Sequence, residues 1–160
     1  MRSYTRHVTY AAIIAAMYAA LTHLQNLLLP GSATWAIQFR VSEALCILAF
    51  FTPAAIPGLA VGALVFNLSF AGALPLDFLV GSLASGLAAT GMWLTRKYTF
   101  KGYPLAGMLM PALFNALLVG WELTVYIGSG FWLNAALVAA GEAAVLLTLG
   151  SVLYTVIRSR

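Results

Sequence analysis

The chain has 160 residues, of which 62% are hydrophobic and only 8% are Asp, Glu, Lys or Arg. Soluble domains contain about 45–50% apolar and about 25% charged residues, so this composition excludes a soluble globular protein. The formal net charge of +4 does not indicate a nucleic-acid partner, because basic residues of membrane proteins are distributed by topology. Length and even composition indicate a single domain over residues 1–160.

Long apolar stretches recur along the chain, and most are of the length that crosses about 30 Å of hydrocarbon as an α-helix. Period-two alternation is absent, which favours an all-α membrane protein over a barrel. Turns such as Pro30-Gly31 and Gly128-Ser129-Gly130 separate the stretches. The six predicted spans, of which the second is short, are 8–29, 41–51, 57–71, 76–94, 105–127 and 132–156.

Basic residues test this arrangement, because cytoplasmic loops hold an excess of Lys and Arg. Six spans place both termini on one side of the membrane, together with the connections at 52–57 and 96–101. The basic residues expected on that side are Arg2, Arg6, Arg96, Lys97, Lys101, Arg158 and Arg160. Only Arg40 lies opposite. The distribution therefore predicts that both termini are cytoplasmic.

Five ionisable residues lie within the spans or at their edges: Arg40, Glu43, Asp77, Glu122 and Glu142. Such residues are costly in lipid and are candidates for a functional site. Arg40 and Glu43 are three positions apart, so they are placed either to pair with each other or to contact a ligand. Asp77 stands at the start of a span, where a cap on the helix N-terminus is the favoured interpretation.

Other polar and aromatic side chains extend this set of candidate ligand contacts: Asn67, Asn115, Trp121, Tyr126 and Asn134. Asn115 and Glu122 share one helical stripe, since they are seven residues apart. Most of the polar candidates fall in the outer half of the membrane, which predicts an outward-facing pocket. The alternative is that they only join helices by hydrogen bonds, each contributing about 1 kcal/mol. Four carboxylates against one Arg favour a donor-rich or cationic solute, and a planar heterocycle could stack on an aromatic ring.

The first span carries two ladders of small residues at four-residue spacing: Ala11, Ala15 and Ala19, and Ala12, Ala16 and Ala20. Small residues at this spacing let a second helix approach closely. Spacing alone favours packing against the chain's own helices, and docking onto a separate membrane subunit is the alternative.

Motifs for catalysis and cofactor binding are absent. The sequence has no G-x-x-x-x-G-K-[ST] loop, no H-E-x-x-H helix and no G-x-S-x-G elbow. Cys46 is the only cysteine, and His7 and His23 are far apart, so neither a disulfide nor a metal site is expected. We therefore expect that the chain is not an enzyme and binds no cofactor.

Several segments resemble the QueT family, whose members are queuosine-precursor substrate-binding (S) components of energy-coupling factor (ECF) transporters. The similar segments are QFRVSEAL from Gln38, FTPAAIPGL from Phe51, LDFLVGSLA from Leu76, NALLVGWEL from Asn115, and Gly141-Glu142. The resemblance implies a six-helix S-component bundle in a prokaryotic cell membrane, with a ligand pocket near the outer face. It also implies two kinds of partner: a transmembrane scaffold (T) subunit and two cytoplasmic ATPases, which would use the ATP.

The resemblance further implies that the chain topples in the membrane to deliver its ligand, and it favours the alanine ladders as a surface facing the scaffold. The implied substrates are deazaguanines such as queuine or 7-aminomethyl-7-deazaguanine. A carboxylate accepts two parallel hydrogen bonds from a guanine-like edge, so Glu122 or Glu142 would take that edge and another acid the amine. Trp121 or Tyr126 would stack on the ring. The alternative is a stand-alone secondary transporter or channel for a cationic solute, with Glu142 in ion or proton coupling.

Overall fold

The computed structural model describes the backbone of residues 2–32 and 39–159, and side chains from Tyr4 onward. Helices make up most of this part of the chain, and the one β-bridge in it joins Phe100 to Tyr103. The elements are α1 (Arg2–Leu28), η1 (Val41–Phe50), α2 (Ala55–Ser69), α3 (Asp77–Thr95), α4 (Leu105–Met108), α5 (Met110–Ile127), α6 (Phe131–Val145), η2 (Leu146–Gly150) and α7 (Ser151–Arg158).

The six predicted spans correspond to helices, and two of them are interrupted. The fifth breaks at Leu109, between α4 and α5, where Pro111 occupies the first turn of α5. Proline lacks the N–H that a continuous helix would need and its ring clashes with the carbonyl four residues earlier, so the helix restarts there. The sixth contains η2, a π-helical turn that joins α6 to α7.

Four helical segments are long and apolar enough to cross a membrane: Tyr4–Leu28, Asp77–Thr95, Leu105–Ile127 and Phe131–Arg158. No more than half of the residues in each apolar window are buried within the protein. Large apolar side chains such as Leu83, Val125 and Leu133 therefore face outward, with 53%, 57% and 59% of their surface exposed. Such a surface requires lipid as its solvent.

The other two predicted spans are shorter than a bilayer. α2 has 15 residues and a length of about 22 Å at 1.5 Å per residue. η1 is a 3₁₀ helix of ten residues, about 20 Å long at 2.0 Å per residue. Eight of its ten residues are buried. η1 is thus surrounded by protein. A short or non-α-helical segment is tolerated within a membrane when it is buried in protein in this way.

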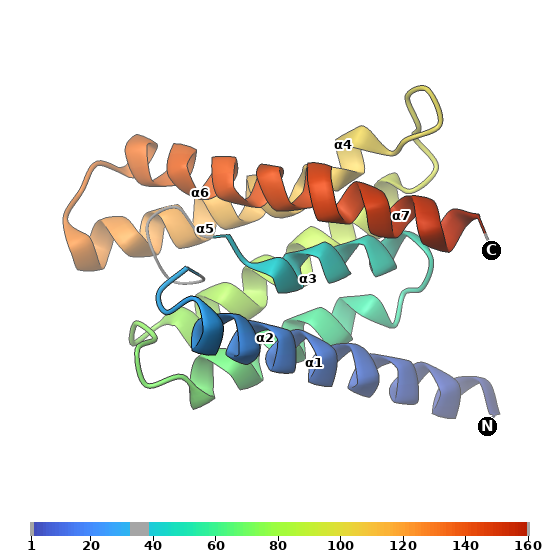
Figure 1. Cartoon of the computed structure of the whole chain (residues 1–160), viewed down its shortest axis with the longest axis horizontal. Coiled ribbons are helices and arrows are strands. Elements are labelled where there is room, and N and C mark those ends of the chain that lie inside the picture. The colour runs from blue at the N-terminus through green and yellow to red at the C-terminus, as the bar shows by residue number, and fades with distance from the viewer. Residues whose placement is uncertain (1, 33–38, 160) are drawn as a thin grey trace.

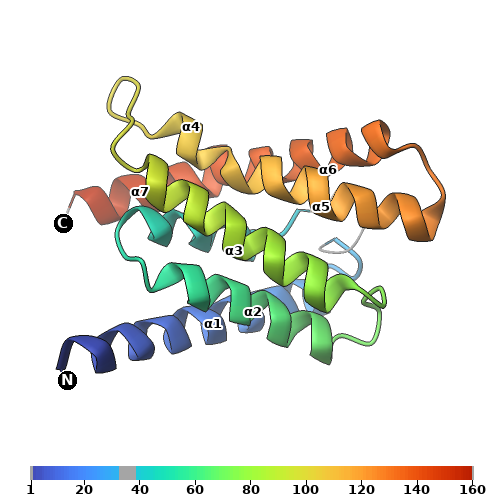
Figure 2. The same cartoon turned by 180° about the vertical axis from the view of Figure 1, so that it is seen from behind.

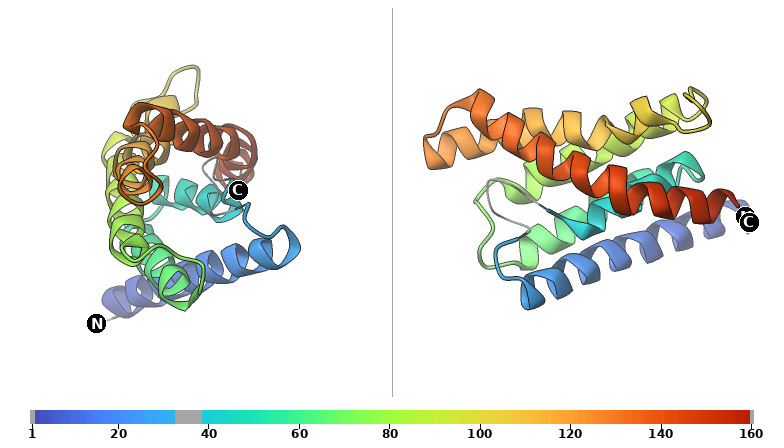
Figure 3. Two further views of the ribbon diagram at one scale, coloured as in Figure 1. Left: turned by 90° about the vertical axis from the view of Figure 1, so that its left-hand side faces the viewer. Right: turned by 45° about the horizontal axis from the view of Figure 1, so that its top comes forward.

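The helices surround η1 in chain order, as the end-on view in Figure 3 shows. Neighbours in the sequence pack side by side: α1 with α2, α2 with α3, α3 with α5, and α5 with α6. η1 contacts helices from both halves of this arrangement, including α1, α3 and η2. Its buried face contributes Cys46 and Ile47 to the main apolar core, each fully buried.

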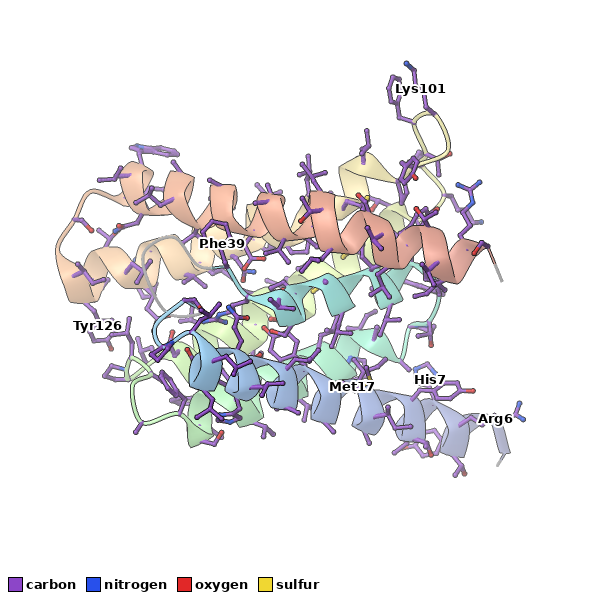
Figure 4. All side chains as sticks on the ribbon, viewed as in Figure 1. Arg6, His7, Met17, Phe39, Lys101 and Tyr126 are labelled. Atoms are coloured by element: carbon purple, nitrogen blue, oxygen red, sulfur yellow. The ribbon has the colours of Figure 1, made fainter. Side chains whose placement is uncertain are left out.

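The first residues of α1 and the last residues of α7 lie at the same end of the bundle (Figures 1 and 2). We call this the basic end, because the described side chains of Arg6, Arg96, Lys97, Lys101 and Arg158 belong to its helix ends and loop. Figure 4 labels Arg6 and Lys101 there. Arg160 lies outside the described residues, and Arg2 is described by its backbone alone.

α1 and α2 approach closely at two glycines. A Cβ atom at Gly58 would lie 2.9 Å from the carbonyl oxygen of Ala11. At Gly62 it would lie 2.7 Å from the Cβ of Tyr18 and 3.0 Å from the carbonyl oxygen of Ala15. Both glycines are therefore required for this helix contact.

This contact corrects the predicted partner surface. Ala15 and Ala19 are buried and Ala11 is half-buried, because α2 packs along their ladder. The second ladder, Ala12, Ala16 and Ala20, is exposed along its whole length. Only that second ladder is free to meet another subunit.

Candidate functional site

Polar side chains gather inside the bundle, away from the basic end. The buried members are Arg40 and Glu43 at the start of η1, Asn67 on α2, Asp77 on α3, Asn115 and Glu122 on α5, and Asn134 and Glu142 on α6. None exposes more than 8% of its surface. These eight residues are all candidates from the sequence, and the fold brings them from five elements into its interior.

Glu43 is anchored to its surroundings by both carboxylate oxygens. The Tyr18 hydroxyl donates a hydrogen bond to Oε1, and the Cys46 Sγ lies 3.1 Å from Oε2. Arg40 is 5% exposed and within electrostatic range of Glu43 and Glu142. Because both of its oxygens have partners, Glu43 has a structural role in joining η1 to α1.

Three polar residues of α1, which sequence analysis missed, hold the start of η1. Besides Tyr18, the Thr22 hydroxyl lies 2.7 Å from that of Ser42. The Gln25 Oε1 accepts a 2.8 Å hydrogen bond from the backbone N–H of Val41. Tyr18, Thr22 and Gln25 are spaced by four and three residues, so they form a polar stripe on an otherwise apolar helix. That stripe is the sequence pattern from which these contacts could have been predicted.

Four buried acceptor atoms of the site accept no hydrogen bond from an N–H or hydroxyl group. Asn115 donates from Nδ2 to the Oε1 of Glu142 at 2.9 Å, which leaves Oε2 of Glu142 without a partner. Neither oxygen of Glu122 accepts a hydrogen bond from an N–H or hydroxyl group, and its side-chain partner is the Asp77 carboxyl, with which it shares a hydrogen bond when one of the two acids is protonated. The Oδ1 of Asn67 is the fourth. Each buried acceptor without a hydrogen bond destabilises the folded protein by about 1–3 kcal/mol, and by more if it is charged. The site is therefore suited to a ligand with several hydrogen-bond donors.

Residues 8–159 match the family model described as QueT transporter. The chain belongs to the QueT transporter family. The resemblance inferred from sequence segments is thus confirmed over nearly the whole chain. No curated protein and no solved structure gives a significant match. This QueT chain is a multi-pass membrane protein of a transporter family, and its buried polar cluster is the candidate site for a transported solute.

Two buried polar residues of the QueT chain form hydrogen bonds that stabilise turns between helices. The predicted helix cap at Asp77 is corrected, because Leu76 is the N-cap and Asp77 the first helical residue. The Oδ2 of Asp77 instead accepts a 2.7 Å hydrogen bond from the backbone N–H of Leu74 in the preceding turn. Asn134 closes the α5–α6 turn, with its Oδ1 2.8 Å from the Ser129 hydroxyl and its Nδ2 3.0 Å from that of Thr124.

The two aromatic candidates lie at the surface of this QueT chain. Trp121 is 49% and Tyr126 40% exposed, whereas Glu122 is fully buried. Trp121 is one residue from Glu122 and so points about 100° away around the helix. Tyr126 is four residues from Glu122, on the same side, near the end of the bundle opposite the basic end (Figure 4). Tyr126 is therefore the better placed of the two rings.

Gly81 of α3 makes room for the Asn67 amide in this site. A Cβ atom at position 81 would lie 2.6 Å from the Nδ2 of Asn67. That nitrogen donates a 2.7 Å hydrogen bond to the carbonyl oxygen of Asp77. The glycine thus fixes the direction of the amide and of its unpartnered oxygen. The described part of the chain contains no group of three His, Cys, Asp or Glu side chains that could hold a metal ion.

Proposed function

We propose that this chain is the substrate-binding (S) component of an ECF importer and captures a queuosine precursor of the queuine or 7-aminomethyl-7-deazaguanine type. The observation that carries the proposal is the set of unpartnered buried acceptors on Asn67, Glu122 and Glu142 in a QueT-family bundle. A site with unpartnered acceptors selects a ligand that supplies donors.

The geometry supports an order for the acids. A guanine-like edge presents two adjacent N–H donors, and Glu122 is the carboxylate of which neither oxygen accepts a hydrogen bond from an N–H or hydroxyl group, so we assign the edge to Glu122 in place of its contact with Asp77. Glu142 has one unpartnered oxygen and is assigned to the aminomethyl cation or a third ring donor. Tyr126 is assigned to stacking on the ring. Glu43 is left out of ligand contact, because both of its oxygens have partners.

The proposal includes six membrane crossings with both termini in the cytoplasm. Basic side chains favour the cytoplasmic side, which makes the basic end internal and places Glu122, near the opposite end of α5, close to the outer face. α2 and η1 would complete the crossing inside the bundle.

Import requires an energy source outside this chain, which has no phosphate-binding loop. We assign the exposed ladder of Ala12, Ala16 and Ala20 to contact with the transmembrane scaffold subunit. The two cytoplasmic ATPases would drive toppling of the chain, which carries the loaded site inward.

Ligand binding to the purified protein tests the site. Titration with queuine, 7-aminomethyl-7-deazaguanine, guanine and adenine should rank the deazaguanines first. Hydrogen bonds to charged groups contribute about 1.5–3 kcal/mol, so Glu122→Gln should weaken binding by about 10- to 100-fold. Glu43→Gln makes the same chemical change at a partnered carboxylate and is the matched control. A folded Glu122→Gln variant with unchanged affinity would remove Glu122 from the pocket.

A second measurement tests the energy source. Liposomes that contain this chain alone should bind ligand without accumulating it, and uptake should require the scaffold and ATPases. Uptake should also stop when the ATP site of the ATPases is inactivated. Accumulation by the chain alone, driven by an ion or proton gradient, would instead establish a stand-alone secondary transporter.

A further inference from the structure

A cleft remote from the buried acids opens at the basic end. Its volume is about 310 Å³, and it lies between the loop that precedes α4 and the end of α7. The loop turns sharply at Lys101 and Gly102, whose φ angles are 50° and 85°. Backbone hydrogen bonds of 2.8 and 3.0 Å between Phe100 and Tyr103 close this turn.

Side-chain contacts fix the turn against α7. The hydroxyl groups of Tyr103 and Thr155 lie 3.1 Å apart, and the rings of Tyr103 and Tyr154 are 5.8 Å apart. The Arg158 Nη1 donates a hydrogen bond to the carbonyl oxygen of Gly102. Because a guanidinium has five N–H donors, Arg158 keeps others for a ligand. These contacts hold the walls of the cleft in fixed positions.

The cleft is rich in positive charge. Lys101 and Arg158 line it, and none of its lining residues is acidic. Its hydroxyl groups donate within the protein: that of Thr155 to the carbonyl oxygen of Ser151, that of Ser159 to the carbonyl oxygen of Val156, and that of Tyr103 to Thr155. The chain has only four Asp and Glu residues, and all of them are buried in the candidate functional site. No acidic side chain of this protein is thus placed to neutralise the cleft. An anion from outside meets this need.

The surroundings of the cleft indicate the source of that anion. The loop projects sideways from the bundle axis beside the helix end, as Figures 1 and 2 show. In the proposed topology, this places it at the level of the cytoplasmic lipid headgroups. Val152 and Val156 of α7 are 64% and 48% exposed. Val152 is three residues before Thr155 and seven before Ser159, so this apolar face continues from the cleft along the helix. Phe100 on the loop is 64% exposed.

We propose that this cleft binds the phosphate headgroup of an anionic phospholipid. Arg158 binds the phosphate with the N–H groups that its bond to Gly102 leaves over, the Lys101 side chain turns toward it from the tip of the loop, and an acyl chain lies along Val152 and Val156. Basic clefts between membrane helices on the cytoplasmic side are suited to such headgroups. The site is separate from the pocket for the transported solute and does not depend on its identity.

Lipid binding to the purified full-length chain in detergent tests the proposal. Phosphatidylglycerol and phosphatidylcholine are titrated separately, and bound lipid is counted by native mass spectrometry. Each basic side chain contributes about fivefold to binding at an anionic surface, so Lys101→Gln/Arg158→Gln should weaken phosphatidylglycerol binding about 25-fold. Lys101→Gln alone should weaken it about fivefold and keeps the Arg158 contact with the loop, should the double variant not fold.

Arg6→Gln is the matched control, because it removes one exposed positive charge from the same end of the bundle, on α1 rather than at the cleft. It should leave phosphatidylglycerol binding unchanged. Equal losses in Arg6→Gln and Lys101→Gln would show diffuse attraction and overturn the site. Equal binding of phosphatidylcholine would also overturn it. Displacement of phosphatidylglycerol by millimolar inorganic phosphate would identify a free anion as the ligand and refute the lipid assignment.

Discussion

Replacement of Tyr18 by Phe isolates the hydrogen bond that joins α1 to Glu43. Tyr18 is fully buried and Glu43 is 1% exposed, so no bulk water replaces the lost donor. Hydrogen bonds to charged groups contribute about 1.5–3 kcal/mol, and the ring of Phe fills nearly the same space. We expect Tyr18→Phe to lower the free energy of unfolding by about 2 kcal/mol. At 2–4 °C per kcal/mol, this corresponds to a fall in Tm of about 4–8 °C.

The assay is thermal unfolding of the purified protein in detergent, followed by ligand titration of each variant. Glu43→Gln and the double variant complete a thermodynamic cycle, in which contacting residues typically show coupling of about 0.5–3 kcal/mol. Affinity for the ligand should change less than threefold, since Tyr18 acts on a carboxylate outside the proposed ligand contacts. A Tm equal to that of the unchanged protein, or additive effects in the cycle, would refute the anchoring role of this hydrogen bond.

Three further substitutions test the helix contacts. Gly62→Ala should destabilise the protein by about 1–3 kcal/mol through overpacking between α1 and α2, measured by thermal unfolding. Gly86→Ala, also inside a helix, is its matched control and should be neutral or slightly stabilising, because a Cβ there would meet only the Cβ of Ala60 at 3.4 Å. Gly81→Ala should displace the Asn67 amide and weaken ligand binding about tenfold, because about one hydrogen bond to the ligand is lost. Full affinity in this variant would place Asn67 outside the pocket. Ala16→Leu should spare ligand binding but reduce copurification of the scaffold subunit, whose full recovery would exclude this face as the docking surface.

The sequence predicts helix positions well because apolar length and Pro/Gly turns are local signals. Gly128, with φ 77°, ends α5 where the turn signal places it. The break at Leu109 follows from Pro111. Whether a proline breaks a helix or only kinks it depends on the surrounding packing, and the periodicity of the sequence carries no information on that packing. η1 is harder still. A ten-residue, mainly apolar segment fits a short α-helix or a 3₁₀ helix equally well, and the choice depends on the helices around it.

The candidate site shows the same division. The buried polar residues could be identified from the sequence, since ionisable groups in apolar spans are rare and informative. Their hydrogen-bond partners could not, because these come from other helices. Glu43 and Glu122 look alike in the sequence, yet both oxygens of Glu43 have hydrogen-bond donors, whereas Glu122 meets only the carboxyl of Asp77. Likewise, which alanine ladder of α1 is covered depends on Gly58 and Gly62, about fifty residues away.

The hydrogen bonds from α1 to η1 also bear on biogenesis. η1 carries Ser42 and Glu43 yet is too short to cross a bilayer, so it is a poor substrate for insertion by itself. Its partners Tyr18, Thr22 and Gln25 precede it in the chain and leave the ribosome first. We therefore expect α1 and η1 to enter the membrane as one hairpin, with the polar groups of η1 already bonded when they reach the hydrocarbon.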